Sequence, residues 1–223
     1  MATEKLSIGI IGGSGQEGGG LALRWAAAGH DVIIGSRAAE KAQAAAQKLN
    51  AILGVRGQMR GGTNADAAAQ SIVVLAVPFA AQLATAEALK EQLTGKILID
   101  VTVPLLPPKV SRVQLPAEGS AVLILQRELG EAVRVVSAFQ NVSAPHLKDL
   151  AHVVDCDVLV CGDDPAAREI VIGLARDAGM RGWHAGVLAN SAAAEALTSV
   201  LIAINRHYKV PGAGIRITGL PRD

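Results

Sequence analysis

The chain has 223 residues, a formal net charge of +1 at neutral pH, and only two Trp, two Phe and one Tyr among its aromatic residues. This balance excludes the basic surface and stacking platforms of nucleic-acid binders, so we expect no nucleic-acid partner. Half of the residues are hydrophobic, but Gly, Ser, Asp or Pro interrupts the apolar runs before the ~20 residues that a membrane-spanning helix needs, and no apolar signal segment opens the chain. We therefore expect a cytoplasmic protein with no membrane partner.

The first part of the chain alternates short apolar runs with helical patterns. Residues 6–11 and 31–35 are typical of buried strands, and residues 18–28 and 38–49 of the helices that follow them. Gly29 is placed to end the first helix as its C′ residue.

The same alternation continues toward the middle of the chain. Residues 71–77 and 96–101 form two more apolar runs, separated by a helical stretch at 80–93. Strands and helices at this spacing predict βαβ units on a parallel sheet. The sequence therefore predicts an α/β fold with a Rossmann-type, doubly wound parallel sheet.

The last part adds further strands and helices. Strands are expected at 134–139 and 157–161, and helices at 165–178 and 191–208. The final helix is rich in Ala and apolar on most sides, so we expect it to be buried against the sheet or against a second copy of the chain.

A glycine loop directly follows the first strand, with the spacing Gly13-x-Gly15-x-x-Gly18. In a dinucleotide-binding fold the first glycine allows a tight turn, the second lets a diphosphate approach the backbone, and the third packs the helix on the strand. The N-terminus of that helix presents N–H groups to the anion. The alternative is an ordinary glycine-rich turn, but the strand before it and the helix after it favour the phosphate loop. The candidate residues are Gly13, Ser14, Gly15, Gln16, Glu17 and Gly18.

The residues after the second strand indicate which dinucleotide is bound. A fold that prefers NAD(H) usually carries Asp or Glu there for the ribose 2′-hydroxyl, whereas this chain has Ser36 and Arg37, with Lys41 one helical turn later. Arg37 can bind a 2′-phosphate through two hydrogen bonds, so the sequence favours NADP(H). The alternative is that Arg37 and Lys41 are only a solvated start of the helix.

Val77 and Pro78 end the next parallel strand, where ligands collect in open sheets. Pro78 lacks an N–H and stiffens the wall that we expect to face the nicotinamide ribose. The alternative is a simple stop to the strand.

Taken together, these segments resemble the F420-dependent NADP oxidoreductases, which carry a hydride between NADPH and the deazaflavin coenzyme F420. The likeness spans nearly the whole chain and implies a homodimer with a cleft in which the nicotinamide and deazaflavin rings face each other. It rests on residues 10–15, on residues 35–37 with Lys41, on 135–138 and 160–164, and on 190–191 ahead of 195–198.

The resemblance also implies roles for individual residues. It assigns residues 1–150 to an NADP(H)-binding Rossmann domain and residues 151–223 to a smaller helical or α+β lobe that completes the second cleft and the dimer contact. The phosphate loop with Ser36, Arg37 and Lys41 is similar to the family's NADP site. Residues similar to those near the nicotinamide are Val77, Pro78 and Ala138, and those similar to the deazaflavin side are Gln140, Asn141, Val142, Thr198 and Ala213.

One position departs from the family pattern, because members carry His where this chain has Gln140. An amide can donate a hydrogen bond to a ring carbonyl but cannot carry a proton. This departure favours one alternative function, an NADPH-dependent reductase acting on an imine, a flavin or a metal chelate.

Hydride transfer between two cofactor rings needs no protein nucleophile and no metal, so we expect no catalytic side chain and no metal site. The five His residues show no metal-ligand spacing. The absence of an identifiable acid or base favours a second alternative, a non-enzymatic NADP(H)-binding redox sensor.

Overall fold

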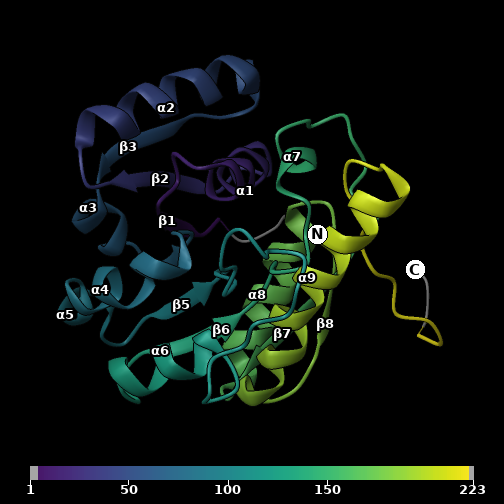
Figure 1. Cartoon of the computed structure of the whole chain (residues 1–223). Helices are drawn as coiled ribbons and strands as arrows, with labels where there is room; N and C mark the ends of the chain where they lie inside the picture. The colour runs from purple at the N-terminus through teal and green to yellow at the C-terminus, as the bar shows by residue number, and fades with distance from the viewer. Residues whose placement is uncertain (1–4, 221–223) are drawn as a thin grey trace.

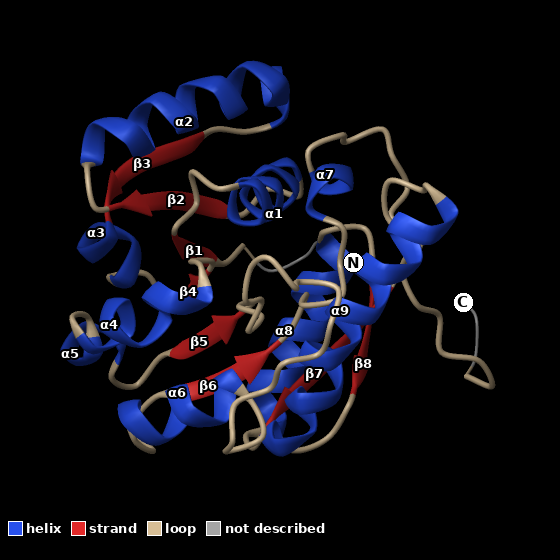
Figure 2. Cartoon of the chain, in the orientation of Figure 1, coloured by secondary structure: helices blue, strands red, loops and turns tan. Residues whose placement is uncertain are grey.

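The structure is a computed structural model that describes residues 5–220. One eight-stranded sheet runs through it, with helices on both faces (Figure 1, Figure 2). Its strands are β1 (Ser7–Ile11), β2 (Asp31–Ser36), β3 (Met59–Thr63), β4 (Ile72–Leu75), β5 (Ile97–Asp100), β6 (Arg134–Ser137), β7 (Asp157–Gly162) and β8 (Arg181–His184). They lie in the order β3-β2-β1-β4-β5-β6-β7-β8, which confirms the doubly wound α/β prediction.

Every neighbouring pair of strands is parallel except β6 and β7, which pair antiparallel. From β1 the chain adds β2 and then β3 on one side of the sheet, and it then returns to the other side of β1 to add β4 and the strands that follow. Loops that follow β1 and β4 therefore diverge, and a crevice opens between them at the carboxyl edge of the sheet.

Nine helices are assigned within residues 5–220: α1 (Gln16–Ala27), α2 (Ala39–Leu53), α3 (Asn64–Ala68), α4 (Gln82–Glu87), α5 (Lys90–Leu93), α6 (Ala121–Leu129), α7 (Ala144–Leu147), α8 (Pro165–Asp177) and α9 (Ser191–Tyr208). Strand side chains alternate between two buried clusters. Ile10 and Val74 pack in the cluster that contains α1, α2 and α8, while Val73 and Leu75 pack in the cluster with α3 and α6.

The strands predicted before residue 102 are confirmed as β1, β2, β4 and β5. The first helix begins at Gln16 rather than at residue 18, and Gly29 follows its end with a φ of 98°, as the C′ prediction requires. The helix expected at 80–93 was predicted wrongly as one element, because the chain forms a 3-10 turn at Phe79–Ala81 and then two short helices, α4 and α5. The break places Leu89 and Leu93 in the core.

Two strands and one longer helix were not predicted. β3 contains Gly61 and Gly62 and has little apolar character, and β8 is a short, partly exposed edge strand. α6 follows the proline-rich segment, and Ser120 caps it by accepting a hydrogen bond from Leu123 N at 3.0 Å.

The later predicted elements are confirmed as β6, β7, α8 and α9. Because β7 pairs with β6, the sheet continues across the boundary expected at residue 150. The division into residues 1–150 and 151–223 stays a prediction.

One face of α9 contacts α6 and β7, while Val200, Ile204 and Tyr208 on α9 are exposed. The expectation that this helix is buried against the sheet is therefore confirmed for one face of α9, and burial against a second copy of the chain stays a prediction. Within the described part of the chain, Leu188–Tyr208 is the one helical segment long and apolar enough to cross a membrane by length and composition, a test that core helices also pass.

Arg24, on α1, connects this helix to the segment 146–152 and to the end of α8. It is 7% exposed, and its guanidinium donates five hydrogen bonds to main-chain carbonyl oxygens. The acceptors, 2.9–3.1 Å away, belong to His146, Leu147, Asp149, His152 and Ala178. One side chain thus satisfies a cluster of carbonyl groups that lies away from any strand.

Replacing Arg24 by Met should lower the free energy of unfolding by at least about 3 kcal/mol, because each buried carbonyl left without a donor costs about 1–3 kcal/mol. Denaturant titration measures the loss. Arg60→Met is the matched control, since Arg60 is exposed and its one ion pair among residues 5–220 is with Asp31, at 3.2 Å; its cost should stay below about 1 kcal/mol. Equal costs for the two variants would contradict this role of Arg24.

Candidate functional site

The turn after β1 lies at the mouth of the crevice. Gly12 has a φ of 80°, a conformation that favours glycine, and Gly15 N donates to Gly12 O at 3.0 Å to close the turn. The tight turn was predicted at Gly13; instead, Gly13 lies so close to β2 that a Cβ there would come 2.6 Å from Ile34. Gly18 meets its predicted role, because a Cβ there would come 3.0 Å from the Ala76 Cβ.

Gly15 is the N-cap of α1 and is open on its outer side. A Cβ there would meet only Gly12 O, at 3.3 Å, and Ser14, Gly15 and Gln16 are all exposed. The first N–H groups of a helix have no partner within the helix, so this end of α1 offers donors to an anion. The geometry fits the diphosphate that the sequence predicts here.

A first cavity of about 270 Å³ lies between this turn and the end of β2. Its walls include Ser36 and Arg37, and Arg37 makes no hydrogen bond or ion pair within residues 5–220. Lys41 lies on the exposed side of α2 and is not among the lining residues. Of the three residues predicted to bind the 2′-phosphate, the structure therefore brings Ser36 and Arg37 together in one cavity wall and leaves Lys41 outside it. The lining residues are Gly12, Ser14, Gly15, Ser36, Arg37, Asn64, Ala76, Val77, Pro78, Ala81 and Thr85.

Asn64 is a wall residue that sequence reasoning missed. It follows β3, and its buried Oδ1 has no hydrogen-bond partner among the described residues. β3 was not predicted, so nothing in the sequence placed its end beside Arg37. The one signal that could have indicated β3 is the length of chain between the helix predicted to end at residue 49 and the strand predicted to begin at residue 71, which is enough for one more strand.

A second cavity, of about 420 Å³, adjoins the first and shares Gly15, Val77 and Pro78 with it. Val77 and Pro78 therefore lie at the junction of the two cavities, and their predicted position beside the nicotinamide ribose stays a prediction. The cavity is lined by Gly15, Gln16, Glu17, Ala76, Val77, Pro78, Phe79, Val101, Thr102, Val103, Leu105, Gln140, Val142 and Thr198.

A third cavity, of about 250 Å³, shares Gln140, Val142 and Thr198 with the second. Asn141 and Ala213 line it as well, so all the residues predicted for the deazaflavin side lie along these two cavities. Its lining residues are Gln140, Asn141, Val142, Ser143, Ala144, Pro145, Thr198, Leu201, Ile202, Asn205, Pro211 and Ala213. The three cavities form one row from Arg37 to Ala213.

The backbone that carries Gln140 is held in an uncommon conformation. Phe139 has a φ of 72° although it is buried and bulky, and its ring meets the Trp25 ring edge-on with centroids 5.8 Å apart. Thr198 Oγ1 donates to Gln140 O at 2.7 Å. Strain of this kind persists only where the surroundings fix it, and it is typical of functional sites.

Gln140 and Asn141 are 3% and 2% exposed. The Gln140 amide donates to Asp100 O at 2.7 Å, and the Asn141 amide donates to Asp157 O at 2.7 Å. One of the two N–H donors of the Gln140 amide, which was expected to be able to face a ring carbonyl, is therefore engaged with the main chain. Ala138, which was predicted to lie near the nicotinamide, is fully buried and lines none of these three cavities, so the structure does not place it on the cleft wall.

Sequence reasoning also missed a buried carboxyl cluster behind the second cavity. Asp100, at the end of β5, accepts hydrogen bonds from the Gln82 amide and from Thr102 N, the latter at 2.7 Å. Burial raises the pKa of Asp100 to about 6, although these hydrogen bonds oppose the rise. Burial raises the pKa of Glu17 to about 8, with a smaller contribution from the Asp100 charge.

Glu195, on α9, belongs to the same cluster. Its carboxylate accepts hydrogen bonds from Ala121 N at 2.9 Å and Val122 N at 3.2 Å, and so caps α6. Burial raises the pKa of Glu195 to about 7. Three carboxyl groups therefore titrate near neutral pH at this edge of the sheet, and Glu17, which lines the second cavity, is mostly neutral at pH 7.

Among residues 5–220, no group of three or more His, Cys, Asp and Glu residues is arranged to hold a metal ion. The carboxylates of Asp100 and Glu195 instead accept hydrogen bonds from the Gln82 amide and from main-chain N–H groups, while the buried Oε1 of Glu17 has no hydrogen-bond partner among the described residues.

Comparison with known proteins gives consistent matches. Residues 7–104 match the family model described as NADP oxidoreductase, coenzyme F420-dependent. The chain is 44% identical to the F420-dependent NADP reductase of Methanocaldococcus jannaschii, over 96% of this chain and 99% of that protein. It is also 44% identical to the F420-dependent NADP reductase of Methanothermobacter thermautotrophicus, over 98% and 97%. A crystal structure of a provisionally assigned F420-dependent NADP reductase from an Arthrobacter species is 27% identical, with a TM-score of 0.78 over 96% of this chain and 99% of that one.

The raised pKa of Glu17 predicts a pH dependence of stability. Between its ordinary pKa of 4.5 and the folded value of about 8, the unfolded chain loses a proton that the folded chain keeps, so the free energy of unfolding falls as the pH rises through that window. Glu17→Gln should make the decline between pH 5 and pH 8 smaller, as measured by denaturant titration. Part of the decline should remain, because Asp100 and Glu195 also have raised pKa values.

The matched control for this measurement is Glu40→Gln, at an exposed position on α2, which should keep the wild-type decline. A Glu17→Gln variant with an unchanged decline would mean that Glu17 is ionised in the fold at neutral pH.

Proposed function

The chain belongs to the family of F420-dependent NADP oxidoreductases, and on this premise we propose that it transfers a hydride between NADP(H) and coenzyme F420. One observation carries the proposal. Three adjoining cavities run along the carboxyl edge of the sheet, from the Arg37 guanidinium to the C-terminal segment at Ala213, and each shares wall residues with the next. Such a row can hold two elongated cofactors whose ends meet in its middle.

The first cavity suits the adenosine and diphosphate part of NADP(H). Main-chain N–H groups at the N-terminus of α1, with residues 13–18, would hold the diphosphate, since Gly15 leaves no side chain in its path. Ser36 and Arg37 would hold the 2′-phosphate, and Lys41 would add charge from the neighbouring turn of α2. Asn64 adds an amide to the same wall.

The second and third cavities suit two ring systems. Val77 and Pro78 would flank the nicotinamide side, with Ala138 behind them in the core, while Gln140, Asn141, Val142, Thr198 and Ala213 would form the deazaflavin side. The second cavity is also lined by the apolar side chains of Phe79, Val101, Val103 and Leu105, which would help to exclude water from the meeting point of the two rings.

When bound, the two cofactors supply the hydride donor and the acceptor, so the protein needs no nucleophile of its own. The role of the chain is to position the two rings. The strained turn at Phe139, the hydrogen bond from Gln140 to Asp100 O and the hydrogen bond from Thr198 to Gln140 O would fix one wall of the cleft. The turn after β1 would fix the opposite wall. Glu17, neutral at pH 7, keeps a second negative charge away from the diphosphate.

The wider organisation is also part of the proposal. Val187, Val200, Ile204 and Tyr208 expose apolar side chains along and beside α9, which supports a homodimer that covers this face. The balanced charge supports a cytoplasmic protein that binds small cofactors and neither nucleic acid nor a membrane. Residues 151–223 would then act as the lobe that completes the second half of the cleft.

The proposed activity is tested by mixing the protein with NADPH and oxidised F420 under anaerobic conditions and following the visible absorbance of the deazaflavin. Bleaching over many turnovers is expected. Tight NADPH binding without bleaching would contradict the proposal and favour a reductase for another substrate or a redox sensor.

The cofactor preference is tested at Arg37. Arg37→Ala should weaken NADPH binding by about 1–3 kcal/mol, because charge-assisted hydrogen bonds to phosphate are lost, and should change NADH binding much less. Lys41→Ala should have a smaller effect, since Lys41 lies outside the cavity wall. Fluorescence titration with both nucleotides measures the constants, and equal losses for NADPH and NADH would show that Arg37 does not read the 2′-phosphate.

A further inference from the structure

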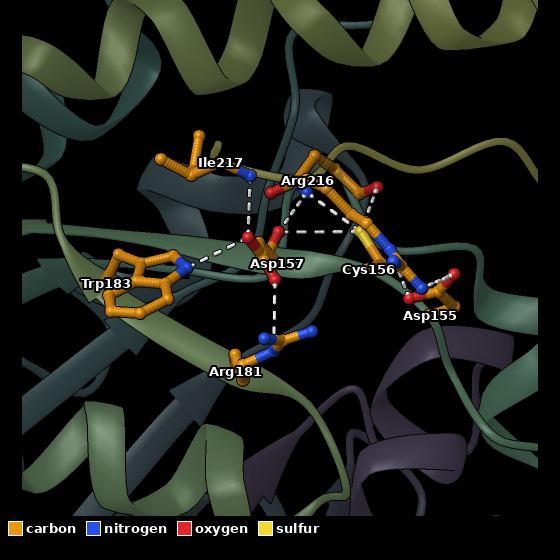
Figure 3. Close-up of polar contacts among 8 residues, drawn as sticks. Asp155, Cys156, Asp157, Arg181, Trp183, Arg216 and Ile217 are labelled. Atoms are coloured by element: carbon orange, nitrogen blue, oxygen red, sulfur yellow. Dashed lines mark hydrogen bonds and ion pairs between the residues drawn. The ribbon is translucent and has the colours of Figure 1, made fainter. Parts of the chain in front are cut away.

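We propose that Asp157 is a positioning residue for the second half of the cleft, which it builds by holding the C-terminal segment 211–217 in place as a wall. The proposal rests on the proposed function, because it assigns this half of the cleft to the deazaflavin. Asp157 is the first residue of β7 and lies at the centre of the contacts in Figure 3. Asp157 lines neither the second nor the third cavity, so an effect of Asp157 on F420 binding must pass through other residues.

Asp157 is 3% exposed, and its carboxylate accepts hydrogen bonds from two different segments of the chain. Oδ2 accepts from Ile217 N at 2.7 Å and from Trp183 Nε1 at 2.9 Å, and Oδ1 lies 3.7 Å from Arg181 Nε (Figure 3). The main-chain N–H of Asp157 donates to Ile215 O at 2.8 Å. The segment is thus paired with the start of β7 on both sides of residue 216.

The segment also packs closely on the body of the protein at its two glycines. A Cβ on Gly214 would come 2.8 Å from both Cβ and Sγ of Cys156, and one on Gly212 would meet the Ser143 hydroxyl and the His146 ring. Ala213 N donates to Asn205 Oδ1, on α9, at 2.7 Å. Side chains at 212 and 214 would push the segment away, so glycine is required there by close approach.

Two parts of the cavity wall meet at residue 157. Pro211 and Ala213 of the segment line the third cavity, and the Asn141 amide, which lines it from the other side, donates to Asp157 O. Releasing the segment would therefore widen the deazaflavin half without touching the first cavity, whose wall contains no residue beyond Thr85. Burying a carboxylate costs free energy of folding unless hydrogen-bond donors surround it. The donors around Asp157, one of them from the segment 211–217, therefore favour a specific role for Asp157 in holding that segment.

The test compares full-length variants in the NADPH and F420 assay. Asp157→Asn places an amide beside Arg181 and should raise the KM for F420 about 3- to 10-fold. Gly214→Val leaves Asp157 intact and displaces the segment by its contact with Cys156, so it should raise the same KM at least as much. In both variants the KM and Kd for NADPH should stay within twofold of wild type. Hydrogen exchange of segment 211–217 should be faster in both.

Asp155→Asn is the matched control. Asp155 pairs with Arg216 on the exposed side of the same segment, with Arg216 Nε 2.6 Å from Oδ1, and the variant should leave both KM values within twofold of wild type. The proposal is overturned if hydrogen exchange shows the segment released while the KM for F420 is unchanged, or if both KM values rise together. Failure of the wild-type protein to reduce F420 would instead overturn the proposed function.

Discussion

The parallel alignment of β1 with β2 on one side and β4 on the other is the constraint on which the site depends. Because these strands run in the same direction, the turn after β1, Arg37 after β2 and the Val77-Pro78 segment after β4 all lie at one edge of the sheet. β5 and β6 add Thr102 and Gln140 at the same edge. The antiparallel pairing of β7 then brings the amino end of that strand, with Asp157, beside the C-terminal segment, so a late part of the chain closes a cleft begun by its first strand.

Three carboxyl groups lie at or behind the wall of the second cavity, and only Glu17 among them lines it. Glu17 is half-buried close to the buried Asp100, which in turn lies near the buried Glu195, and burial raises the pKa of each toward neutrality. Holding such groups partly protonated limits the negative charge close to a cofactor that already carries several phosphates. Asp100 accepts hydrogen bonds from Gln82 and from Thr102 N, and Glu195 accepts from the N-terminus of α6, so these two carboxylates connect β5 and α9 to the elements around the cleft.

The parts of the molecule that sequence could predict are those written in short stretches. The strand, glycine turn and helix at residues 6–28, and Arg37 after the next strand, follow from local spacing, and so does the doubly wound sheet. The parts that it missed depend on distant contacts. β3 and β8 are edge strands with weak patterns. The positive φ lies at Gly12, and Gly13 packs on Ile34 of the next strand. The Asp100 cluster and the Asp157 contacts join residues far apart in the chain. The resemblance to a family supplied Gln140 and Thr198, but not the bonds that hold them.

The central claim is that the two cofactors meet directly in one cleft. It is tested by a single turnover with NADPH that carries deuterium at the transferable position, followed by mass analysis of the deazaflavin formed. Direct transfer predicts that the reduced deazaflavin carries the label in both light and heavy water. Reduced deazaflavin that takes its new carbon-bound hydrogen from the solvent would contradict a shared cleft.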